Sequence, residues 1–343
     1  PGQREKTLAQ IDKLLLSVGA MKSGTTWLYR QLEQHPSITF SPEKEIHYLA
    51  YLAGNRSHLN LAYRAGRLAN ARQRARGRGV ALRPAEYAWY LDYLLMPKTW
   101  GWYARRFATV APGQYCADFS NLSALLDQDN WQRLTERVKD LRLIYILRHP
   151  LDRIWSQLKS HYRASGNQQL LASMRGYAAD PGVPEDELVS HSLYAQNLAR
   201  ILEVVPREQV HVVFYDQIQE DPEGLLRDVE GFLQIPRHNY LPAKLGRRIN
   251  ASDAMPRPDW VTQHFYPRVA ADLKALAKFD ISVRVSWHTL WLPTDFSPRQ
   301  STGRVPGCSA GANCGRAGGW SRRVRCGTGG RAGGAGSVAG GGG

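Results

Sequence analysis

The sequence predicts an α/β protein with a central parallel sheet covered by helices on both faces. Three short runs of apolar and β-branched residues are typical of buried strands: Leu14–Gly19, Leu141–Leu147 and Val210–Tyr215. Each run is followed by apolar residues at helical spacing. Strands that alternate with helices favour a parallel sheet between two helical layers.

The helices are predicted from the same spacing. Trp27, Leu28 and Leu32 share one helix face after the first strand, and the helix ends at His35–Pro36 because the residue before a proline disfavours the α region. Pro150 suits the first turn of the helix after the second strand. Further helices are expected within 86–107, over 129–138 and 187–205, and from Asp221 onward.

Composition bounds the domain organisation. The chain has 343 residues, of which 43% are hydrophobic and 22% charged, which is typical of a globular protein. We expect one domain over residues 1–300. Residues 301–343 contain 16 Gly, six Arg and no acidic residue, so this tail is predicted to be disordered.

The net charge of +15 favours polyanionic partners without saying which. Residues 46–85 contain eight Arg and no Asp or Glu, and Ala71–Gly79 alternates Arg with small residues. We expect an exposed, mobile Arg-rich loop over about 64–83. It is either a solvated basic loop or a docking patch for an anionic acceptor or partner.

Cysteine usage and hydropathy bear on the compartment. Cys116 is the single cysteine before the tail, so no disulfide framework is expected. No apolar run is long enough to span a membrane and no signal peptide is visible. We expect a cytoplasmic protein, with a lumenal fragment of a membrane-anchored enzyme as the alternative.

The turn after the first strand is a candidate phosphate site. A strand, a Gly-containing turn and a helix point backbone N–H groups at one spot. Gly19-x-x-x-x-Gly24-Thr25-Thr26 has the spacing of a nucleotide P-loop, so the fold is expected to be a P-loop-like three-layer α/β/α domain. Thr25 stands where a nucleoside triphosphatase needs lysine, and the lysine comes earlier, at Lys22. No predicted strand ends in an aspartate of the magnesium-holding type.

A second candidate phosphate site follows the second strand. Arg148 stands at the strand end, and Ser156 lies eight residues later on the following helix. A guanidinium and a hydroxyl there can converge on a phosphate. Alone, the pair is better explained as an ordinary salt bridge and a solvated serine.

Together, the motifs resemble a known family. Met21–Leu28 is similar to the 5′-phosphosulfate loop of sulfotransferases that use 3′-phosphoadenosine 5′-phosphosulfate (PAPS), and Leu147–Ser156 is similar to their 3′-phosphate motif. Val213–Ile218 resembles a third block, whose tyrosine lies near the nucleotide. Order and spacing agree over roughly residues 12 to 290.

Within this family, Ser41–Leu49 resembles the Glu-x-His-aromatic segment of heparan-sulfate-type, glycan-directed enzymes and bacterial relatives. The resemblance implies that Glu45 is the catalytic base and that His47 is its neighbour. It implies that Asp118 and Ser120 lie near the acceptor, and that the catalytic set is Lys22, Glu45 and His47. The residues expected to bind the nucleotide are Lys22, Ser23, Gly24, Thr25, Thr26, Trp27, Arg148, Ser156, Tyr215, Arg247 and Arg248.

The reaction implied is in-line transfer of the sulfuryl group of PAPS to a hydroxyl or amine, with adenosine 3′,5′-bisphosphate as product and no metal ion. The acceptor is carbohydrate-like or a small molecule, and an anionic glycan is one candidate. A specific nucleic-acid partner is not expected, and the protein is a monomer or a homodimer. The alternatives are a P-loop kinase or NTPase and a non-enzymatic polyanion-binding protein.

Overall fold

The computed structural model describes residues 11–180, 182–246, 249, 255–284 and 287. The chain divides into two compact units, residues 1–293 and 294–343, and all described residues belong to the first. The predicted tail 301–343 and the predicted nucleotide ligands Arg247 and Arg248 lie outside the described residues.

A five-stranded parallel sheet forms the centre of the first unit, as predicted. Its strands are β1 (Ile11–Gly19), β2 (Ile38–Phe40), β3 (Tyr115–Asp118), β4 (Val138–Leu147) and β5 (Val210–Phe214). Their order across the sheet is β2-β3-β1-β4-β5. In the register, Leu16 of β1 lies opposite Asp118 of β3 and Leu143 of β4.

Helices surround this sheet, and short 3₁₀ turns connect several of them. The α-helices are α1 (Thr25–Leu32), α2 (Tyr48–Leu52), α3 (Leu61–Gly77), α4 (Pro84–Leu95), α5 (Trp100–Ala104), α6 (Gln128–Thr135), α7 (Pro150–Ala164), α8 (Gln168–Ser173), α9 (Glu185–Ser190), α10 (Tyr194–Leu202), α11 (Gln217–Glu220), α12 (Pro222–Leu233), α13 (Pro242–Leu245) and α14 (Asp259–Ala275). The 3₁₀ turns are η2 (Ser57–Leu59), η3 (Arg105–Phe107), η4 (Asn121–Leu125), η5 (Tyr177–Ala179), η6 (Arg207–Gln209) and η7 (Leu276–Phe279).

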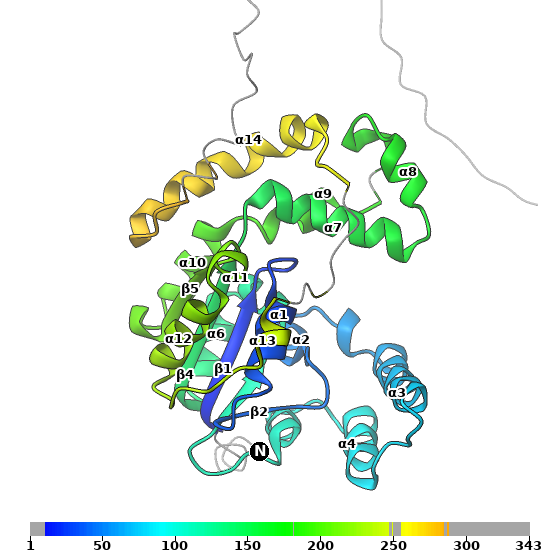
Figure 1. Cartoon of the computed structure of the whole chain (residues 1–343), viewed down its shortest axis with the longest axis vertical. Helices are drawn as coiled ribbons and strands as arrows, with labels where there is room; N and C mark the ends of the chain where they lie inside the picture. The colour runs from blue at the N-terminus through cyan, green and yellow to red at the C-terminus, as the bar shows by residue number, and fades with distance from the viewer. Residues whose placement is uncertain (1–10, 181, 247–248, 250–254, 285–286, 288–343) are drawn as a thin grey trace, which may run out of the picture. The chain divides into compact units, whose positions relative to one another are not determined.

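Each face of the sheet carries its own apolar core. Leu15 and Ile144 pack with residues of α1, α12 and α13. Leu14 and Leu16 point to the other face and pack with residues of α5, α6 and α10. Both faces of β1 are therefore buried, which is why its sequence is a continuous apolar run. A third core joins α7, α8, α9 and α14, away from α3 and α4 (Figure 1).

The strand order creates a switch point at the carboxyl end of β1. From β1 the chain builds β2 and β3 on one side, and then β4 and β5 on the other. In open parallel sheets, ligands bind outside the carboxyl ends of the strands at such a point. The Gly19 turn follows β1 and Arg148 follows β4, so both candidate phosphate sites lie there.

The prediction of a mobile loop over 64–83 is wrong for most of its length, because residues 61–77 form α3. Asn60 caps the helix by accepting a hydrogen bond from the Tyr63 backbone N–H at 2.8 Å. Ala71 and Ala75 bury a narrow helix face. The sequence of α3 has no stripe of large apolar residues, because small residues alternate with arginines, so its periodicity gives no helix signal. Alanine and arginine nevertheless both favour the helical conformation.

Two further predictions are corrected in detail. The helix expected over 187–205 is broken into α9 and α10, with the buried His191 between them. The short strands β2 and β3 were not predicted. Strand β3 ends at Asp118, but the carboxylate of Asp118 accepts hydrogen bonds from Ser120 and Tyr103.

Candidate functional site

The turn between β1 and α1 has a backbone that only a few residue types adopt easily. Lys22 and Gly24 both have positive φ, 67° and 87°. A Cβ on Gly24 would lie 2.5 Å from Cδ1 of Ile218 and 3.1 Å from the Tyr215 ring. The glycine is therefore required both by its φ and by the close approach of Tyr215.

The N-terminus of α1 is left open for an anion. Gly24 is the N-cap and provides no side-chain acceptor, and the first turn holds no acidic residue. The first backbone N–H groups of a helix lack intrahelical partners and carry partial positive charge. Ser23 and Thr25 are buried beside this end, and Thr26 lines a neighbouring pocket.

Lys22 lies in a strongly basic environment. Burial lowers the pKa of Lys22, and the charges of Arg163, Arg148 and Arg153 lower it further, whereas Glu45 raises it. Such crowding of positive groups is costly without a counterion. The cluster therefore fits a multiply charged anion.

Arg148 joins the two candidate phosphate sites directly. Its Nη1 donates a hydrogen bond to the Lys22 backbone oxygen at 2.8 Å. Its guanidinium lies 4.4 Å from the centre of the Tyr215 ring. Tyr215 itself approaches Gly24, so one aromatic ring packs against both motifs. The structure brings Lys22, Gly24, Arg148 and Tyr215 together. That they bind a nucleotide stays a prediction.

Ser156 lies on α7, which begins two residues after Arg148, and it is largely buried. Arg153, on the same helix, was not singled out by the sequence although it stands within the 147–156 motif. It is fully buried, and donates hydrogen bonds to Ser192 Oγ at 2.5 Å and to the Met21 backbone oxygen at 3.4 Å. Burial lowers the pKa of Arg153 to about 10. Arg153 therefore stabilises the turn that contains Lys22.

Glu45 and His47 lie within hydrogen-bond distance of each other in the segment after β2. Oε2 of Glu45 lies 3.0 Å from Nε2 of His47, and Oε1 lies 2.9 Å from Nζ of Lys44. Asn121 donates a third hydrogen bond to Oε1 at 3.3 Å. Burial raises the pKa of Glu45, but the hydrogen bond from His47 and the charge of Lys44 outweigh it and lower the pKa to about 2.

Lys44 is a functional candidate that the sequence analysis passed over. Its Nζ bridges Glu45 and Thr25 Oγ1, the latter at 3.4 Å. It therefore connects the Glu45 segment to the first turn of α1. The only sequence signal was its position beside Glu45.

Asp118 and Ser120 support the backbone of the segment that carries Glu45. Oγ of Ser120 accepts hydrogen bonds from the backbone N–H groups of Ile46 and His47, at 3.0 and 2.8 Å, and donates to Asp118 at 2.5 Å. Tyr103 donates to the other Asp118 oxygen at 2.9 Å. These contacts indicate a supporting role, and contact with an acceptor stays a prediction.

Ser120→Ala is expected to lower the free energy of unfolding by about 1–3 kcal/mol, because two buried N–H groups lose their acceptor. Denaturant unfolding would measure this. The control is Ser123→Ala, since the buried Oγ of Ser123 has no hydrogen-bond partner among the described residues. Equal stability losses for the two variants would contradict the supporting role of Ser120.

Trp27 lies on the buried face of α1. Its side chain is buried in the core, and Nε1 donates to the Leu245 backbone oxygen at 3.1 Å. Gln31 donates to the Lys244 oxygen beside it. The described contacts of Trp27 thus fix the chain that leads to residues 247–248, and a contact of its indole with nucleotide stays a prediction.

Comparison with known proteins identifies the family. Residues 15–239 match a family model described as the sulfotransferase family. Bifunctional heparan sulfate N-deacetylase/N-sulfotransferase 4 of Mus musculus and 3 of Homo sapiens are each 24% identical over 251 residues, covering 69% of this chain and 24% of theirs. The chain thus spans about a quarter of the length of these curated relatives.

A solved structure supports the fold. The crystal structure of a sulfotransferase from Alicyclobacillus acidocaldarius is similar with a TM-score of 0.53 at 20% identity, covering 82% of this chain and all of that chain. This likeness confirms the predicted three-layer α/β fold. Together with the family match over more than half of the sequence, it confirms the predicted resemblance: the chain belongs to the sulfotransferase family.

Proposed function

We propose that the protein transfers a sulfuryl group from PAPS to a hydroxyl or amine of an acceptor. The observation that carries this proposal is the basic cluster at the switch point, where Lys22, the open end of α1 and Arg148 meet. A nucleotide with phosphate groups at both its 5′ and 3′ ends matches two anion sites joined by one guanidinium.

The residues present fit this nucleotide. Lys22 and the N–H groups at Gly24 to Thr26 would hold the 5′-phosphosulfate, and Arg148 with Ser156 would hold the 3′-phosphate. Tyr215 would pack beside them. Arg247 and Arg248 remain proposed ligands of the 3′-phosphate.

PAPS, when bound, supplies an activated sulfuryl group on a phosphate that leaves with added negative charge. Lys22 and the end of α1 would stabilise that charge. Glu45 would accept the proton of the acceptor group. His47 would act as a positioning residue, because its Nε2 is used in the pair with Glu45 and its buried Nδ1 has no partner among the described residues.

The low pKa of Glu45 defines how it would act. A pKa of about 2 keeps the carboxylate ionised at neutral pH and able to receive a proton, but makes it a weak base. A hydroxyl would give up its proton to Glu45 only after bond formation to sulfur has acidified it. Proton removal is therefore proposed to accompany or follow the attack.

The acceptor is proposed to be carbohydrate-like or a small molecule, and an anionic glycan is a candidate because two relatives are named for heparan sulfate. We also propose that the transfer needs no metal and that the protein acts in the cytoplasm as a monomer or homodimer. Within the described part of the chain, no helix combines the length and hydropathy of a membrane span.

Two measurements test the function. Calorimetry should show that the full chain binds adenosine 3′,5′-bisphosphate at one site without added metal. A screen with labelled PAPS, comparing glycans, phenols and lipids, should then find a labelled product. Absence of nucleotide binding would overturn the proposal, and magnesium-dependent ATP cleavage would favour a P-loop NTPase instead.

A further inference from the structure

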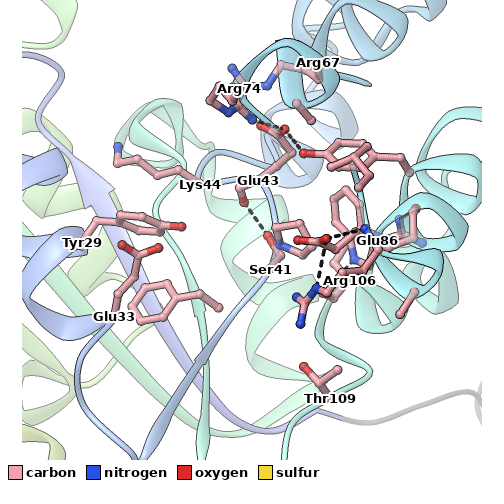
Figure 2. A pocket seen from close by; sticks show the side chains of 18 of the residues that line it. Tyr29, Glu33, Ser41, Glu43, Lys44, Arg67, Arg74, Glu86, Arg106 and Thr109 are labelled. Atoms are coloured by element: carbon pink, nitrogen blue, oxygen red, sulfur yellow. Dashed lines mark hydrogen bonds and ion pairs between the residues drawn. The ribbon is translucent and has the colours of Figure 1, made fainter. Parts of the chain in front are cut away.

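A second basic site lies beside the proposed donor site. A pocket of about 650 Å³, here called the α3–α4 pocket, is bounded by α1, residues 40–44, α3 and α4 (Figure 2). This volume is in the range of small-molecule binding sites. Thr26 and Lys44 belong to its wall, and Lys44 also contacts Glu45, so the pocket borders the sulfuryl-transfer site.

The pocket wall has a large excess of positive charge. Seven basic side chains line it against three acidic ones. The three acids are Glu33, Glu43 and Glu86, and each is already paired with an arginine of the wall. Lys44 and Arg106 are paired with Glu45 and Asp92. An additional anion would therefore meet no unpaired carboxylate of this wall, and the cations best able to bind it are Arg78, which has no ion pair among the described residues, and Arg74, whose contact with Glu43 is 3.4 Å long.

Helix α3 presents its arginines to the pocket as a row. Arg67, Ala71 and Arg74 are spaced three or four residues apart on α3, so they share one helix face. Arg78 follows directly after the end of the helix, and all four residues line the pocket. Ala71 leaves room between the guanidinium groups. The Arg74 side chain is 54% exposed and Arg78 is exposed, so both can turn toward a ligand.

Two of these arginines converge on one buried carboxylate. Glu43 receives an ion pair from Arg67, a contact from Arg74 at 3.4 Å and a hydrogen bond from Tyr90 at 2.5 Å. Figure 2 shows Arg67 and Arg74 beside Glu43. Arg67 is thus fixed, whereas Arg74 is held loosely at the pocket edge.

We propose that the α3–α4 pocket binds a multivalent oxyanion, one that carries at least two carboxylate, phosphate or sulfate groups. Arg74 binds it from α3 and Arg78 from the residue that follows this helix, and Arg30 of α1, which is paired with Glu33, also lines the pocket. Trp89, which is partly buried, provides an aromatic surface in the pocket wall for a ring of the ligand.

The occupant would lie against the segment that carries the proposed base. Glu43 stands two residues before Glu45, and Lys44 joins the two sites. The ligand is either an anionic part of the acceptor or a free anion. The choice between an acceptor and a free anion rests on the proposed function. The binding of an anion does not, because the pocket and its charge do not depend on sulfuryl transfer.

The test uses the full chain with its donor site saturated by adenosine 3′,5′-bisphosphate, so that the probe cannot bind there. Pyrophosphate is titrated by calorimetry at low ionic strength, and one site is expected. The double variant Arg74→Gln/Arg78→Gln should weaken pyrophosphate binding at least about tenfold. The matched control, Arg72→Gln/Arg76→Gln, changes the same charge on the exposed face of α3 and should bind as the wild type.

A hyaluronan tetrasaccharide in place of pyrophosphate distinguishes the two sources. Binding that is lost in Arg74→Gln/Arg78→Gln and displaced by pyrophosphate assigns the pocket to an anionic acceptor. Binding of pyrophosphate alone assigns it to a free anion. The proposal is overturned if neither probe binds, or if both double variants lose binding equally. Failure of adenosine 3′,5′-bisphosphate to bind would overturn the proposed function alone, since pyrophosphate binding can still be compared between the double variants.

Discussion

Glu45→Gln is expected to lower kcat by about 10²–10⁴-fold, the usual contribution of a general base, while the affinity for adenosine 3′,5′-bisphosphate stays nearly unchanged. Glutamine keeps the size of the side chain and an oxygen that can accept the hydrogen bond from His47. It cannot take up the proton of the acceptor. Steady-state turnover of labelled PAPS and nucleotide calorimetry measure the two quantities separately.

The control for this substitution is Glu203→Gln, which removes an exposed carboxylate next to the end of α10 and should leave turnover unchanged. Full turnover of Glu45→Gln would show that the base lies elsewhere, with His47 the next candidate. Loss of nucleotide affinity together with turnover would assign Glu45 to the donor site instead.

Because the pKa of Glu45 is low, Glu45→Gln should also change how the stability of the fold depends on pH in the acid range. The folded-state pKa is about 2 against an ordinary value of 4.5, so the ion pairs of Glu45 stabilise the fold above about pH 4.5 and lose their effect as the pH falls toward 2. The acid-unfolding curves of wild type and Glu45→Gln should therefore converge over this range. Parallel curves would contradict the depressed pKa.

Arg148→Ala is expected to weaken binding of adenosine 3′,5′-bisphosphate by at least about 30-fold. Truncating one partner of a hydrogen-bonded charge pair costs about 2–5 kcal/mol, and 1.4 kcal/mol is a factor of ten. The alanine also releases the Lys22 backbone oxygen, which accepts a hydrogen bond from Arg148. Calorimetry measures the affinity, and chemical denaturation checks that the fold is kept.

Two variants sharpen this experiment. Arg148→Lys keeps the positive charge but cannot donate two parallel hydrogen bonds as a guanidinium does. Its nucleotide affinity should therefore lie between those of Arg148→Ala and the wild type. Arg142→Ala removes another arginine of the β4 segment, one that pairs with Asp140 at 3.0 Å, and should leave nucleotide affinity unchanged. An Arg148→Ala protein that binds as tightly as wild type would exclude Arg148 from the nucleotide site.

The sequence predicted those parts of the fold that have a local signal. β1 and the second half of β4 are buried on both faces, and β5 at the sheet edge is partly buried, so all three appear as apolar runs. β2 and β3 have only three and four residues, too few for a pattern to emerge. Helix α3 was missed because its buried face consists of alanines and of arginines whose partners lie elsewhere in the chain.

The candidate site likewise contains parts with a local sequence signal and parts that depend on long-range packing. Lys22 and Arg148 follow strands, so their meeting at the switch point could be anticipated from the strand order of a parallel sheet. The support of Glu45 could not, because the Ser120 hydrogen bonds join residues more than 70 positions apart. The pairing of Glu43 with Arg67 and Arg74 likewise depends on where α3 packs.

These long separations have a consequence for how the protein folds. The pairing of β1 with β4 closes a loop of more than 120 residues, and Arg148 reaches the Lys22 backbone across 126 positions. Loop-closure entropy must be overcome before such contacts can form, which slows folding. The turn around Lys22 and Gly24 is local in sequence, but the anion site that joins it to Arg148 is complete only after β4 has been synthesised and has joined the sheet.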